Sequence, residues 1–510
     1  MTMNPIATLS ANKYLSGSAR ILSIIGLSIA TFLITLDYSI ANVSLPYISG
    51  DLAVSVDQGT YIITSFAVGN AIILPMTGWL TKRIGTVRLL LLSLLGFVFF
   101  SWLCGASLNF NMLIFSRFFQ GIVAGPLVPL SQTILITTNP PEKKNSVIAI
   151  WSMIIIVGPI LGPVLGGWIT FDFIWRWIFY INVPMGVFSA FLIWMYLRPY
   201  ETKKEKKPVD IIGFILLFIA VTSLQIILDK GEQFDWFKSR IIVTLSVISL
   251  LGFIYLFIWE KYHHSPLIEL SLLKIKTYSV SIFYLLVMYS NYFGAIVLVP
   301  LWLQNYMGYT SLWAGIAVAP VGLAPIVLAQ LSGKMVTKYG AAIPLFVCFL
   351  LFASSCFYSA YFATNVDINH VWISRFILGC GLSFFITPLI ALSAQDIPAD
   401  KLPSATGFFH FVRAMFGGVG TSIYTTMWER RQAFHHERIG ESITVSSMNF
   451  NKFISELHPV DLNLNTGIDL INNIVTSQSA MMAINDVFYF MGWVFIGLVL
   501  FLPMARKRTS

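Results

Sequence analysis

The sequence predicts an all-α polytopic membrane protein of fourteen transmembrane helices, arranged as two six-helix halves plus an inserted helix pair. Three observations lead to this fold class. Hydrophobic residues make up 56% of the 510 residues and charged residues only 11%, whereas soluble domains carry about 25% charged residues. Short polar breaks separate apolar runs that reach the roughly 20 residues needed to cross a bilayer. An internal repeat relates the first part of the chain to the last, as in transporters built from parallel halves.

Fourteen apolar runs are long enough to be spans, and they define the expected domain organisation. The spans cover residues 21–48, 58–80, 88–107, 110–135, 146–170, 176–197, 210–228, 240–259, 277–303, 311–332, 341–363, 370–394, 404–428 and 485–505. The expected parts are an N-terminal segment at 1–20, a first half at 21–197, a basic linker at 198–209, an inserted pair at 210–260, and a second half at 277–505 that contains a long polar loop at 429–484. The start of that loop, ERRQAFHHERIGES, can continue the preceding span as a helix.

Basic residues in the connections are distributed unevenly between the two sides. An even number of spans puts both termini on one side, where 21 Lys and Arg residues fall, and the other side holds eight. Cytoplasmic connections are enriched in Lys and Arg, so we expect both termini and the linker ETKKEKKP to be cytoplasmic. The net charge of +9 therefore reflects topology and does not support nucleic-acid binding.

Two motifs recur about half a chain apart. The octet Gly78–Gly85, GWLTKRIG, matches Gly333–Gly340, GKMVTKYG, and Ser116-Arg117 followed by Gly121 matches Ser374-Arg375 followed by Gly379. Parallel halves of this kind place the substrate site at their interface near the bilayer midplane. The sequence therefore predicts a transporter with its site between the halves.

Several other classes of protein find no support. The four cysteines lie inside apolar runs, where a thiol behaves as a small hydrophobe: Cys104, Cys348, Cys356 and Cys380. Adjacent histidines, His435 and His436, diverge by about 100° on a helix, so we expect no metal site. No Walker A pattern is present, so we expect no cofactor and a proton gradient as the driving force.

Asp37 and Arg117 are the charged residues deepest in the apolar runs of the first half. An Asp near the centre of a span costs about 2.5–3.5 kcal/mol on insertion scales and normally faces a protein interior or a watery cavity. We expect the two residues to pair and to act as a proton switch, because protonation of Asp37 weakens its hold on Arg117. The alternative is a structural ion pair between helices.

The run Trp151–Thr170, WSMIIIVGPILGPVLGGWIT, combines regular glycines with prolines. Its small residues and prolines recur every four residues: Gly158-Pro159, Gly162-Pro163 and Gly166-Gly167. The glycines give one smooth helix face for close packing, and the prolines bend the helix. The pattern favours an interface that slides or rocks over a static tight crossing.

The turn after the second span carries the residues expected at the cytoplasmic gate: Gly78, Lys82, Arg83, Gly85 and Arg88. Its glycines permit a tight turn. In the second half, Arg375 and Arg413 also lie inside spans. Arg413, close to the Gly417-Gly418 pair, binds substrate or stabilises packing; the sequence favours neither alternative.

These motifs resemble a known family. LDYSIANVSLP, GWLTKRIG, SRFFQGIVAGPLVP, GPILGPVLGG and WRWIFYINVPMG are similar to motifs of the major facilitator superfamily, in its fourteen-span drug:proton antiporter branch. LQIILDKGEQFDWF, YTSLWAGIAVAPVG and TSIYTTMWERRQAFHH further resemble the EmrB-type inner-membrane subunits of tripartite multidrug pumps. The resemblance runs from about residue 20 to 505 and implies the major facilitator fold.

The resemblance also implies roles and partners. Asp37 and Arg117 match the proton-coupling residues of the family, and the Gly-Pro helix matches its antiporter motif. It implies a periplasmic adaptor, a TolC-like outer-membrane channel and a Gram-negative inner membrane, with 429–484 as a periplasmic docking surface. The superfamily usually carries an acid where Lys82 stands, so the resemblance does not imply a gate salt bridge from this position.

We therefore expect a proton-driven exporter of hydrophobic or amphipathic toxic compounds that works by alternating access and is not an enzyme. One alternative is a dedicated exporter of a self-made metabolite such as a siderophore. A second is a sensor or scaffold of the same fold that has lost transport. The intact Asp37, Arg117 and Gly-Pro helix argue against it, because a protein that does not transport has no need of buried charges or a sliding interface. Import by proton symport is a third alternative, which the antiporter motif disfavours.

Overall fold

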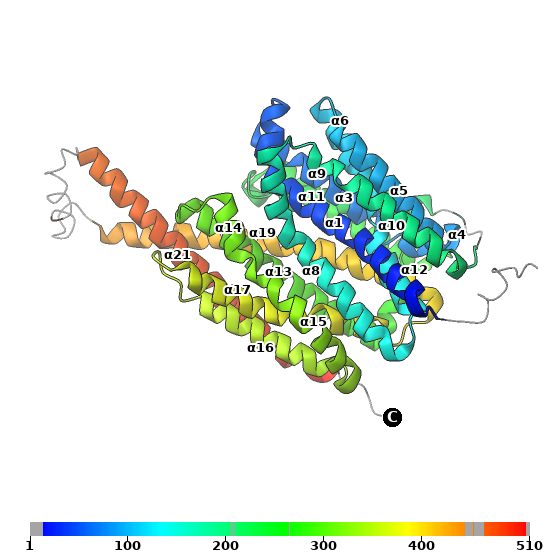
Figure 1. Cartoon of the computed structure of the whole chain (residues 1–510). Coiled ribbons are helices and arrows are strands. Elements are labelled where there is room, and N and C mark those ends of the chain that lie inside the picture. The colour runs from blue at the N-terminus through cyan, green and yellow to red at the C-terminus, as the bar shows by residue number, and fades with distance from the viewer. Residues whose placement is uncertain are drawn as a thin grey trace, which may run out of the picture.

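The computed structural model describes residues 14–505 except 206, 207, 209, 265, 444–451 and 453–463, and within these residues it contains helices and no strands (Figure 1). The first ten helices are α1 Gly17–Asp51, α2 Val56–Gly59, α3 Tyr61–Ile73, α4 Thr77–Ile84, α5 Thr86–Gly105, α6 Phe110–Ala124, α7 Leu127–Thr138, α8 Pro141–Asp172, α9 Trp177–Tyr180 and α10 Asn182–Leu197. Two more follow the linker, α11 Ile211–Lys230 and α12 Arg240–Tyr262. The last eight are α13 Lys276–Tyr306, α14 Ser311–Val318, α15 Pro320–Tyr339, α16 Ala342–Ser359, α17 Ile368–Ser383, α18 Ile386–Ala394, α19 Leu402–Ser442 and α21 Leu464–Val499.

Most of the expected spans correspond to long apolar helices. In the described part of the chain, eleven helices are long and apolar enough to cross a membrane, and thirteen if two bent pairs each form one span. The thirteenth expected span, 404–428, lies in α19 and is not among them, because glycines together with His410 and Arg413 lower its hydropathy. The fold class is thus confirmed, while the count of fourteen stays a prediction.

Prolines and their neighbours account for the bends. α3 and α4 meet at 62° around Pro75, whose ring cannot continue the helical hydrogen-bond ladder. The axis of α8 bends by 44° between its Pro141–Pro159 and Val164–Asp172 segments. The bend expected from the Gly-Pro repeat is therefore present.

The helices of the two parts pack in the same pattern. α1 packs on α8, α3 on α6, and α5 on α6 and α10; correspondingly, α13 packs on α19, α15 on α17, and α16 on α17 and α21. The repeated motifs occupy equivalent places. A Cβ on Gly121 would lie 2.2 Å from the Phe66 carbonyl oxygen of α3, and one on Gly379 would lie 2.4 Å from the Val321 carbonyl oxygen of α15. The sequence repeat is thus a structural repeat of close helix contacts.

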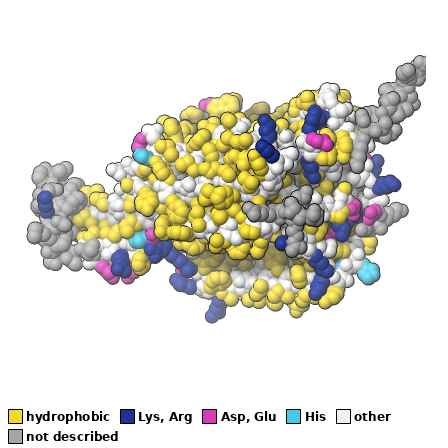
Figure 2. Space-filling model, turned by 90° about the horizontal axis from the view of Figure 1, so that it is seen from below, with side chains coloured by type: hydrophobic (Ala, Val, Ile, Leu, Met, Phe, Trp, Pro, Cys, Tyr) yellow, Lys and Arg dark blue, Asp and Glu magenta, His cyan; other side chains and the backbone are white. Residues whose placement is uncertain are grey.

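The inserted helices α11 and α12 pack mainly on each other at the edge of the bundle. Only 22% of the residues in the most apolar stretch of α12 are buried, compared with 56% in the corresponding stretch of α1. Figure 2 shows hydrophobic side chains over much of the flank of the molecule. Because these side chains are not covered by protein, they are suited to contact with lipid acyl chains.

The polar loop expected over 429–484 is much shorter than predicted. α19 continues to Ser442 as the ERRQAFHHERIGES pattern indicates, but α21 already begins at Leu464, whereas the sequence placed the last span at 485. The Asn, Thr and Ser residues before 485 favoured the prediction of a loop. In the structure, α21 extends beyond the apolar run into this polar segment. Residues between the two helices lie largely outside the described part.

The two halves contact each other near the end of the bundle where α1 begins and α21 ends, here called the terminal face (Figure 1). Hydrogen bonds that join them include Asn145 Nδ2 to Thr337 Oγ1 at 3.0 Å, Thr133 to Thr406 at 2.9 Å between hydroxyls, and His410 Nε2 to Gln132 Oε1 at 2.7 Å. All six residues belong to the halves of their helices nearer the terminal face. This arrangement closes the bundle toward that face.

Candidate functional site

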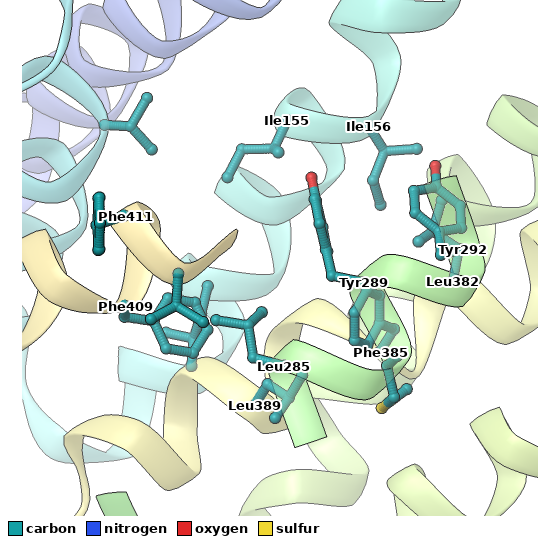
Figure 3. Packing of buried hydrophobic residues seen from close by; sticks show 14 of the residues in the cluster. Ile155, Ile156, Leu285, Tyr289, Tyr292, Leu382, Phe385, Leu389, Phe409 and Phe411 are labelled. Atoms are coloured by element: carbon teal, nitrogen blue, oxygen red, sulfur yellow. The ribbon is translucent and has the colours of Figure 1, made fainter. Parts of the chain in front are cut away.

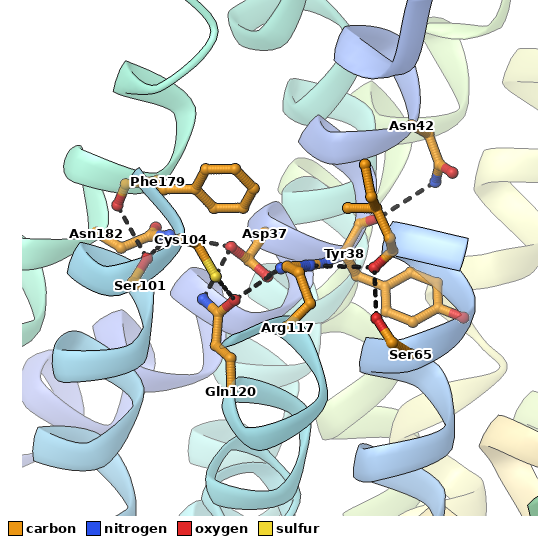
Figure 4. Close-up of polar contacts among 11 residues, drawn as sticks. Asp37, Tyr38, Asn42, Ser65, Ser101, Cys104, Arg117, Gln120, Phe179 and Asn182 are labelled. Carbon is orange, nitrogen blue, oxygen red and sulfur yellow. Dashed lines mark hydrogen bonds and ion pairs between the residues drawn. The ribbon is translucent and has the colours of Figure 1, made fainter. Parts of the chain in front are cut away.

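Asp37 and Arg117 form a buried ion pair between α1 and α6 (Figure 4). Arg117 donates from its NH1 nitrogen to Asp37 Oδ2 at 2.6 Å. The side chain of Asp37 is 0% exposed and that of Arg117 is 1% exposed. The same nitrogen also donates to Gln120 Oε1 at 2.8 Å. The pairing expected from the sequence is therefore present, on helices of the first half alone.

Two amides complete the polar shell of the Asp37 carboxylate. Gln120 donates to Oδ1 at 3.3 Å and Asn182 donates to the same oxygen at 3.1 Å. Asn182 also donates to Ser101 Oγ at 3.0 Å, which links α10 to α5 (Figure 4). Both carboxylate oxygens therefore have donors, as a buried charge requires.

Aromatic rings surround the guanidinium of Arg117. Its Cζ lies 4.3 Å from the centre of the Phe66 ring and 5.4 Å from that of Phe179, and its Nε donates to the Ile62 carbonyl at 3.3 Å. Rings and a carbonyl hold a cation without supplying a second negative charge. In the part of the chain that the structure describes, Asp37 is therefore the single carboxylate that pairs with Arg117, and the charge balance of the site changes when Asp37 takes a proton.

The pair lies one residue away from the space between the halves. Tyr38, adjacent to Asp37, is 42% exposed and lies within electrostatic reach of Tyr289 on α13. Asn42, one helical turn further, is also exposed. Among the exposed side chains of α1, those of Tyr38 and Asn42 lie closest in sequence to Asp37.

The Gly-Pro segment of α8 packs directly on the part of α1 that carries Asp37. A Cβ on Gly158 would lie 2.1 Å from Thr35 Oγ1, and one on Gly162 would lie 2.5 Å from Ser39 Cβ. A Cβ on Gly166 would lie 2.9 Å from a side-chain carbon of Ile40, whereas Gly167 has nothing within 4 Å. Three of the four glycines are therefore required for close contact with α1.

A backbone carbonyl left free by proline is satisfied across this contact. Pro163 has no N–H, so the carbonyl of Pro159 four residues earlier lacks its helical donor. Ser39 Oγ donates to that carbonyl at 2.8 Å. Since Ser39 is two residues from Asp37, this hydrogen bond joins the Gly-Pro segment of α8 to α1 next to the buried ion pair.

The gate turn makes an ion pair that the sequence did not imply. Lys82 Nζ pairs with Glu269, on the connection that leads into the second half, and Lys401 Nζ lies 3.4 Å from the other oxygen of Glu269. Burial raises the pKa of Glu269, but the hydrogen bond and charge of Lys82 and the charge of Lys401 outweigh it and hold this pKa below its usual range. Lys82 and Glu269 therefore form a salt bridge between the last turn of α4 and the connection that leads into the second half.

Among the other gate-turn residues, Gly85 and Arg88 contact Glu201 at the start of the linker. Gly85 has a φ of +101°, a conformation that favours glycine, and the next turn is held by Glu201, whose carboxylate accepts from the Arg88 backbone N–H at 2.8 Å. Arg83 packs over the Trp79 ring at 5.3 Å. A Cβ on Gly78 would lie 2.0 Å from Ser404 Oγ on α19, so the first gate glycine contacts the second half.

A charge exchange tests the gate pair. We expect Lys82→Glu or Glu269→Lys alone to place like charges together and shift the equilibrium away from the closed terminal face by about tenfold, or about 1.4 kcal/mol. The double exchange should restore closure. Because the pKa of Glu269 is lowered, the wild-type pair is intact at neutral pH and is lost as the pH falls through that pKa. The measurement is the maleimide labelling rate of Ile134→Cys, because Ile134 is only 3% exposed in the closed structure and lines a cavity of about 1080 Å³ at this face.

Lys338→Glu is the matched control, because Lys338 occupies the corresponding motif of the second half and packs on its neighbour Tyr339. It should leave the labelling rate unchanged. If the double exchange labels as fast as either single variant, the pair does not close the gate.

The structure does not bring Arg375 and Arg413 into one site. Arg375 is 0% exposed and bonds to the Ala295 carbonyl at 2.9 Å and to the hydroxyls of Ser359 and Ser374 at 2.8 and 3.0 Å. Within the described residues, no carboxylate pairs with it. It therefore occupies the position of Arg117 in the repeat without an acidic partner.

Arg413 lies beside Tyr289, which belongs to the apolar, aromatic cluster shown in Figure 3. Its Cζ is 5.7 Å from the centre of the Tyr289 ring, and it lines a small pocket with that tyrosine, Phe385 and His410. Ile155 and Ile156 of α8 point toward the same cluster in Figure 3. A cation therefore borders this apolar surface.

Comparison with known proteins agrees with this fold. The profile of the Major Facilitator Superfamily matches residues 27–421. The chain is 40% identical over 488 residues to the multidrug export protein EmrB of Escherichia coli K12, covering 96% of this chain and 95% of the relative. It is 38% identical over 492 residues to the fatty acid resistance protein FarB of Neisseria gonorrhoeae, covering 96% and 97%.

A solved structure shows the same fold at much lower sequence similarity. The human organic anion transporter MFSD10 superposes with a TM-score of 0.58 at 13% identity, covering 94% of this chain and all of the other. At this identity the likeness concerns the fold alone. On the family profile and on relatives of 38–40% identity over almost the full length, the chain belongs to the major facilitator superfamily, in its EmrB-type branch.

Proposed function

We propose that this transporter exports hydrophobic or amphipathic toxic compounds in exchange for protons. The observation that carries the proposal is the buried Asp37–Arg117 pair, because a membrane-embedded acid with one cationic partner can bind and release a proton with a large change in local charge. Its relatives EmrB and EmrY bear the names of multidrug export and multidrug resistance proteins. Membership in a transporter family further supports transport as opposed to an enzymatic reaction.

The coupling step follows from the contacts of Asp37. Protonation neutralises the carboxylate and leaves Arg117 with the rings of Phe66 and Phe179 and neutral oxygen acceptors. An uncompensated buried charge is costly, of the order of 3–5 kcal/mol when one partner of such a pair is removed. Protonation therefore destabilises the packing of α1 against α6 and favours the other state of the transporter.

The second state requires the halves to move against each other. In the structure the terminal face is closed by the Lys82–Glu269 pair and by inter-half hydrogen bonds. The smooth face of α8 lets α1 shift along it, since its glycines leave no side chain to interlock. We propose that the terminal face is cytoplasmic, that this conformation is closed to the cytoplasm, and that rocking of the halves opens it.

The proposed substrates are hydrophobic compounds of several chemical types. The cluster around Tyr289 is built from aromatic and aliphatic side chains (Figure 3), which accept varied apolar shapes. Arg413 adds a cation to this surface and is suited to compounds that carry a negative charge. A dedicated exporter of one compound class is the second candidate, supported by a relative named for fatty acid resistance.

The proposed location is a bacterial inner membrane, with both termini in the cytoplasm and an adaptor and a TolC-like channel as partners. The excess of Lys and Arg on the terminal side supports this orientation. The helical ends of α19 and α21 extend on the opposite side (Figure 1). They offer the adaptor a helical surface where the sequence alone predicted a loop.

A substrate panel tests the proposal. In everted vesicles with an imposed pH gradient, we expect uptake of unrelated lipophilic cations and hydrophobic weak acids, collapsed by a protonophore and unaffected by ATP. Response to a single class would favour the dedicated exporter. No response to any compound, with or without the adaptor, would contradict transport and favour a sensor.

A further inference from the structure

The end of α11 is fastened to the first half of the bundle on the side away from the terminal face. Asp229 accepts a hydrogen bond from Thr64 Oγ1 at 2.6 Å, and Lys230 Nζ donates to Thr60 Oγ1 at 3.1 Å. The same short stretch includes Ile62, whose carbonyl accepts from Arg117. The inserted pair is thus attached directly beside the coupling site.

The turn after α11 is fastened to the second half through a carboxylate. Glu232 Oε2 accepts from Thr426 Oγ1 of α19 at 3.1 Å and from Trp236 Nε1 at 2.6 Å. Its carboxyl group is also a hydrogen-bond partner of the Glu429 carboxyl, one turn further along α19. The turn therefore bridges the halves, with one acid from each side of the contact.

Two carboxyl groups that share a hydrogen bond must hold a proton between them, because two carboxylates are acceptors only. We propose that Glu232 and Glu429 form a proton-binding site, separate from Asp37, that fastens the α11–α12 turn to α19 when it holds one proton. Loss of the proton leaves two negative charges in contact and releases the turn. The ligand of this site is a proton from the compartment opposite the terminal face.

The depth of the site supports access to that compartment. Glu429 is 27 residues beyond the start of α19 at Leu402, about 40 Å at 1.5 Å per residue. The hydrocarbon core is only about 30 Å thick. Glu232 belongs to a connection between helices, and Glu429 follows the expected span at 404–428, so the pair lies in the interfacial or aqueous region.

The pKa values of the two acids are shifted in opposite directions. The hydrogen bond from Glu429, followed by those from Trp236 and Thr426 and the charge of Arg430, holds the pKa of Glu232 below its usual range against the effect of burial. Burial, with the hydrogen bond and the negative charge of Glu232, raises the pKa of Glu429 to about 8. Glu429 therefore carries the shared proton. The fastened state binds this proton more tightly than the released state, so it is favoured below about pH 8 and lost as the pH rises through that value.

The other charged groups nearby are already engaged. Asp229 and Lys230 bond to α3 as described, and Asp235 in the turn lies 4.0 Å from Lys238. Arg430 on α19 is the cation that acts on Glu232. None of these supplies a second carboxyl to Glu232, so the titration belongs to the pair.

Infrared difference spectroscopy on the purified full-length protein tests the site without requiring transport. In wild type, we expect a carboxylic-acid C=O band that is lost as the pH is raised through about 8. Glu429→Gln should remove the band, and Glu232→Gln should move its titration toward the ordinary range of a Glu, about 4.3. Glu437→Gln, the same change two turns further along α19, and Asp37→Asn should retain it.

A distance measurement tests the fastening. Spin labels on cysteines at Phe237 and Ala433, in a Cys380→Ser background, should give one narrow distance at about pH 6 and a broad distribution at about pH 9.5, either side of the pKa of Glu429. Glu429→Gln keeps a donor for Glu232 and should stay narrow at both values. The inference is overturned if Glu429→Gln leaves the infrared band in place, or if the wild-type distance does not change with pH.

Because neither readout needs substrate, failure of this inference would leave the proposed export function untouched. Conversely, a protein that exports nothing but shows the band and its loss in Glu429→Gln would retain the proton site. The Asp37→Asn variant separates the two, since it should lose proton-coupled export and keep the band.

Discussion

Replacement of Asp37 by Asn is expected to lower pH-gradient-driven drug accumulation in everted vesicles by about a hundredfold or more, equivalent to about 2.7 kcal/mol. Asn has nearly the same shape, and its single amide oxygen can still accept from Arg117, which donates to Oδ2 in wild type. It cannot exchange a proton. The variant should therefore keep drug-for-drug exchange, which needs no net proton movement, and lose uphill transport.

Asp51→Asn is the matched control for this prediction, because Asp51 lies on the same helix and pairs with Arg176 near the surface, with its side chain 49% exposed. It should reduce transport by less than about twofold, since exposed pairs contribute little. Equal loss in both variants would show that the charge is needed for folding or insertion and not for coupling.

Gly162→Ala is expected to lower transport by about tenfold or more and to reduce the midpoint of thermal unfolding. The new Cβ would lie 2.5 Å from both Cβ and Oγ of Ser39 and 3.1 Å from the backbone nitrogen of Ile40. Inserting a methyl group into close packing costs about 1–3 kcal/mol. The helix α8 must then move away from α1 and disturb the Ser39 hydrogen bond to Pro159.

Gly167→Ala is the control for the glycine face, because nothing lies within 4 Å of its added Cβ. It should leave both the unfolding midpoint and the transport rate close to wild type. Transport is measured in everted vesicles and unfolding in detergent. If both alanine variants behave alike, helix propensity and not the contact with α1 explains the effect.

The sequence predicted those parts of the site whose residues are costly to place in a membrane-spanning helix. An isolated Asp or Arg in hydrocarbon is expensive, so two such residues in one half indicated a pair, and Asp37 and Arg117 form it. The Gly-Pro period likewise predicted a bend and a smooth face, because proline breaks the helical ladder and glycine removes side chains. Both features follow from local chemistry.

The parts that the sequence missed depend on distance in space. Gln120 and Asn182 are uncharged and give no comparable signal inside apolar runs, although Gln120 lies three residues after Arg117 on the same helix face. Glu269 is 187 residues from Lys82, and acids near a membrane surface are common. Only the fold shows that these two residues meet at the gate.

The early start of α21 was missed for another reason. Residues 464–484 are rich in Asn, Ser and Thr, which favour turns and caps over helix interiors. Packing of α21 on α19 overrides this preference, with Trp428 Nε1 donating to the Ala480 carbonyl at 2.9 Å and Arg431 bonded to Asp486. Tertiary contacts therefore extend both helices past the limits that composition predicts.

Drug-induced proton movement is the most direct test of the central claim that export is exchanged for protons through Asp37. Everted vesicles containing wild type or Asp37→Asn are given a pH gradient, and the proton release that follows each added compound is recorded with a pH-sensitive dye. The account predicts release with several unrelated compounds in wild type and none in the variant. Proton release by Asp37→Asn at the wild-type rate would contradict it, because coupling would then reside elsewhere in the protein.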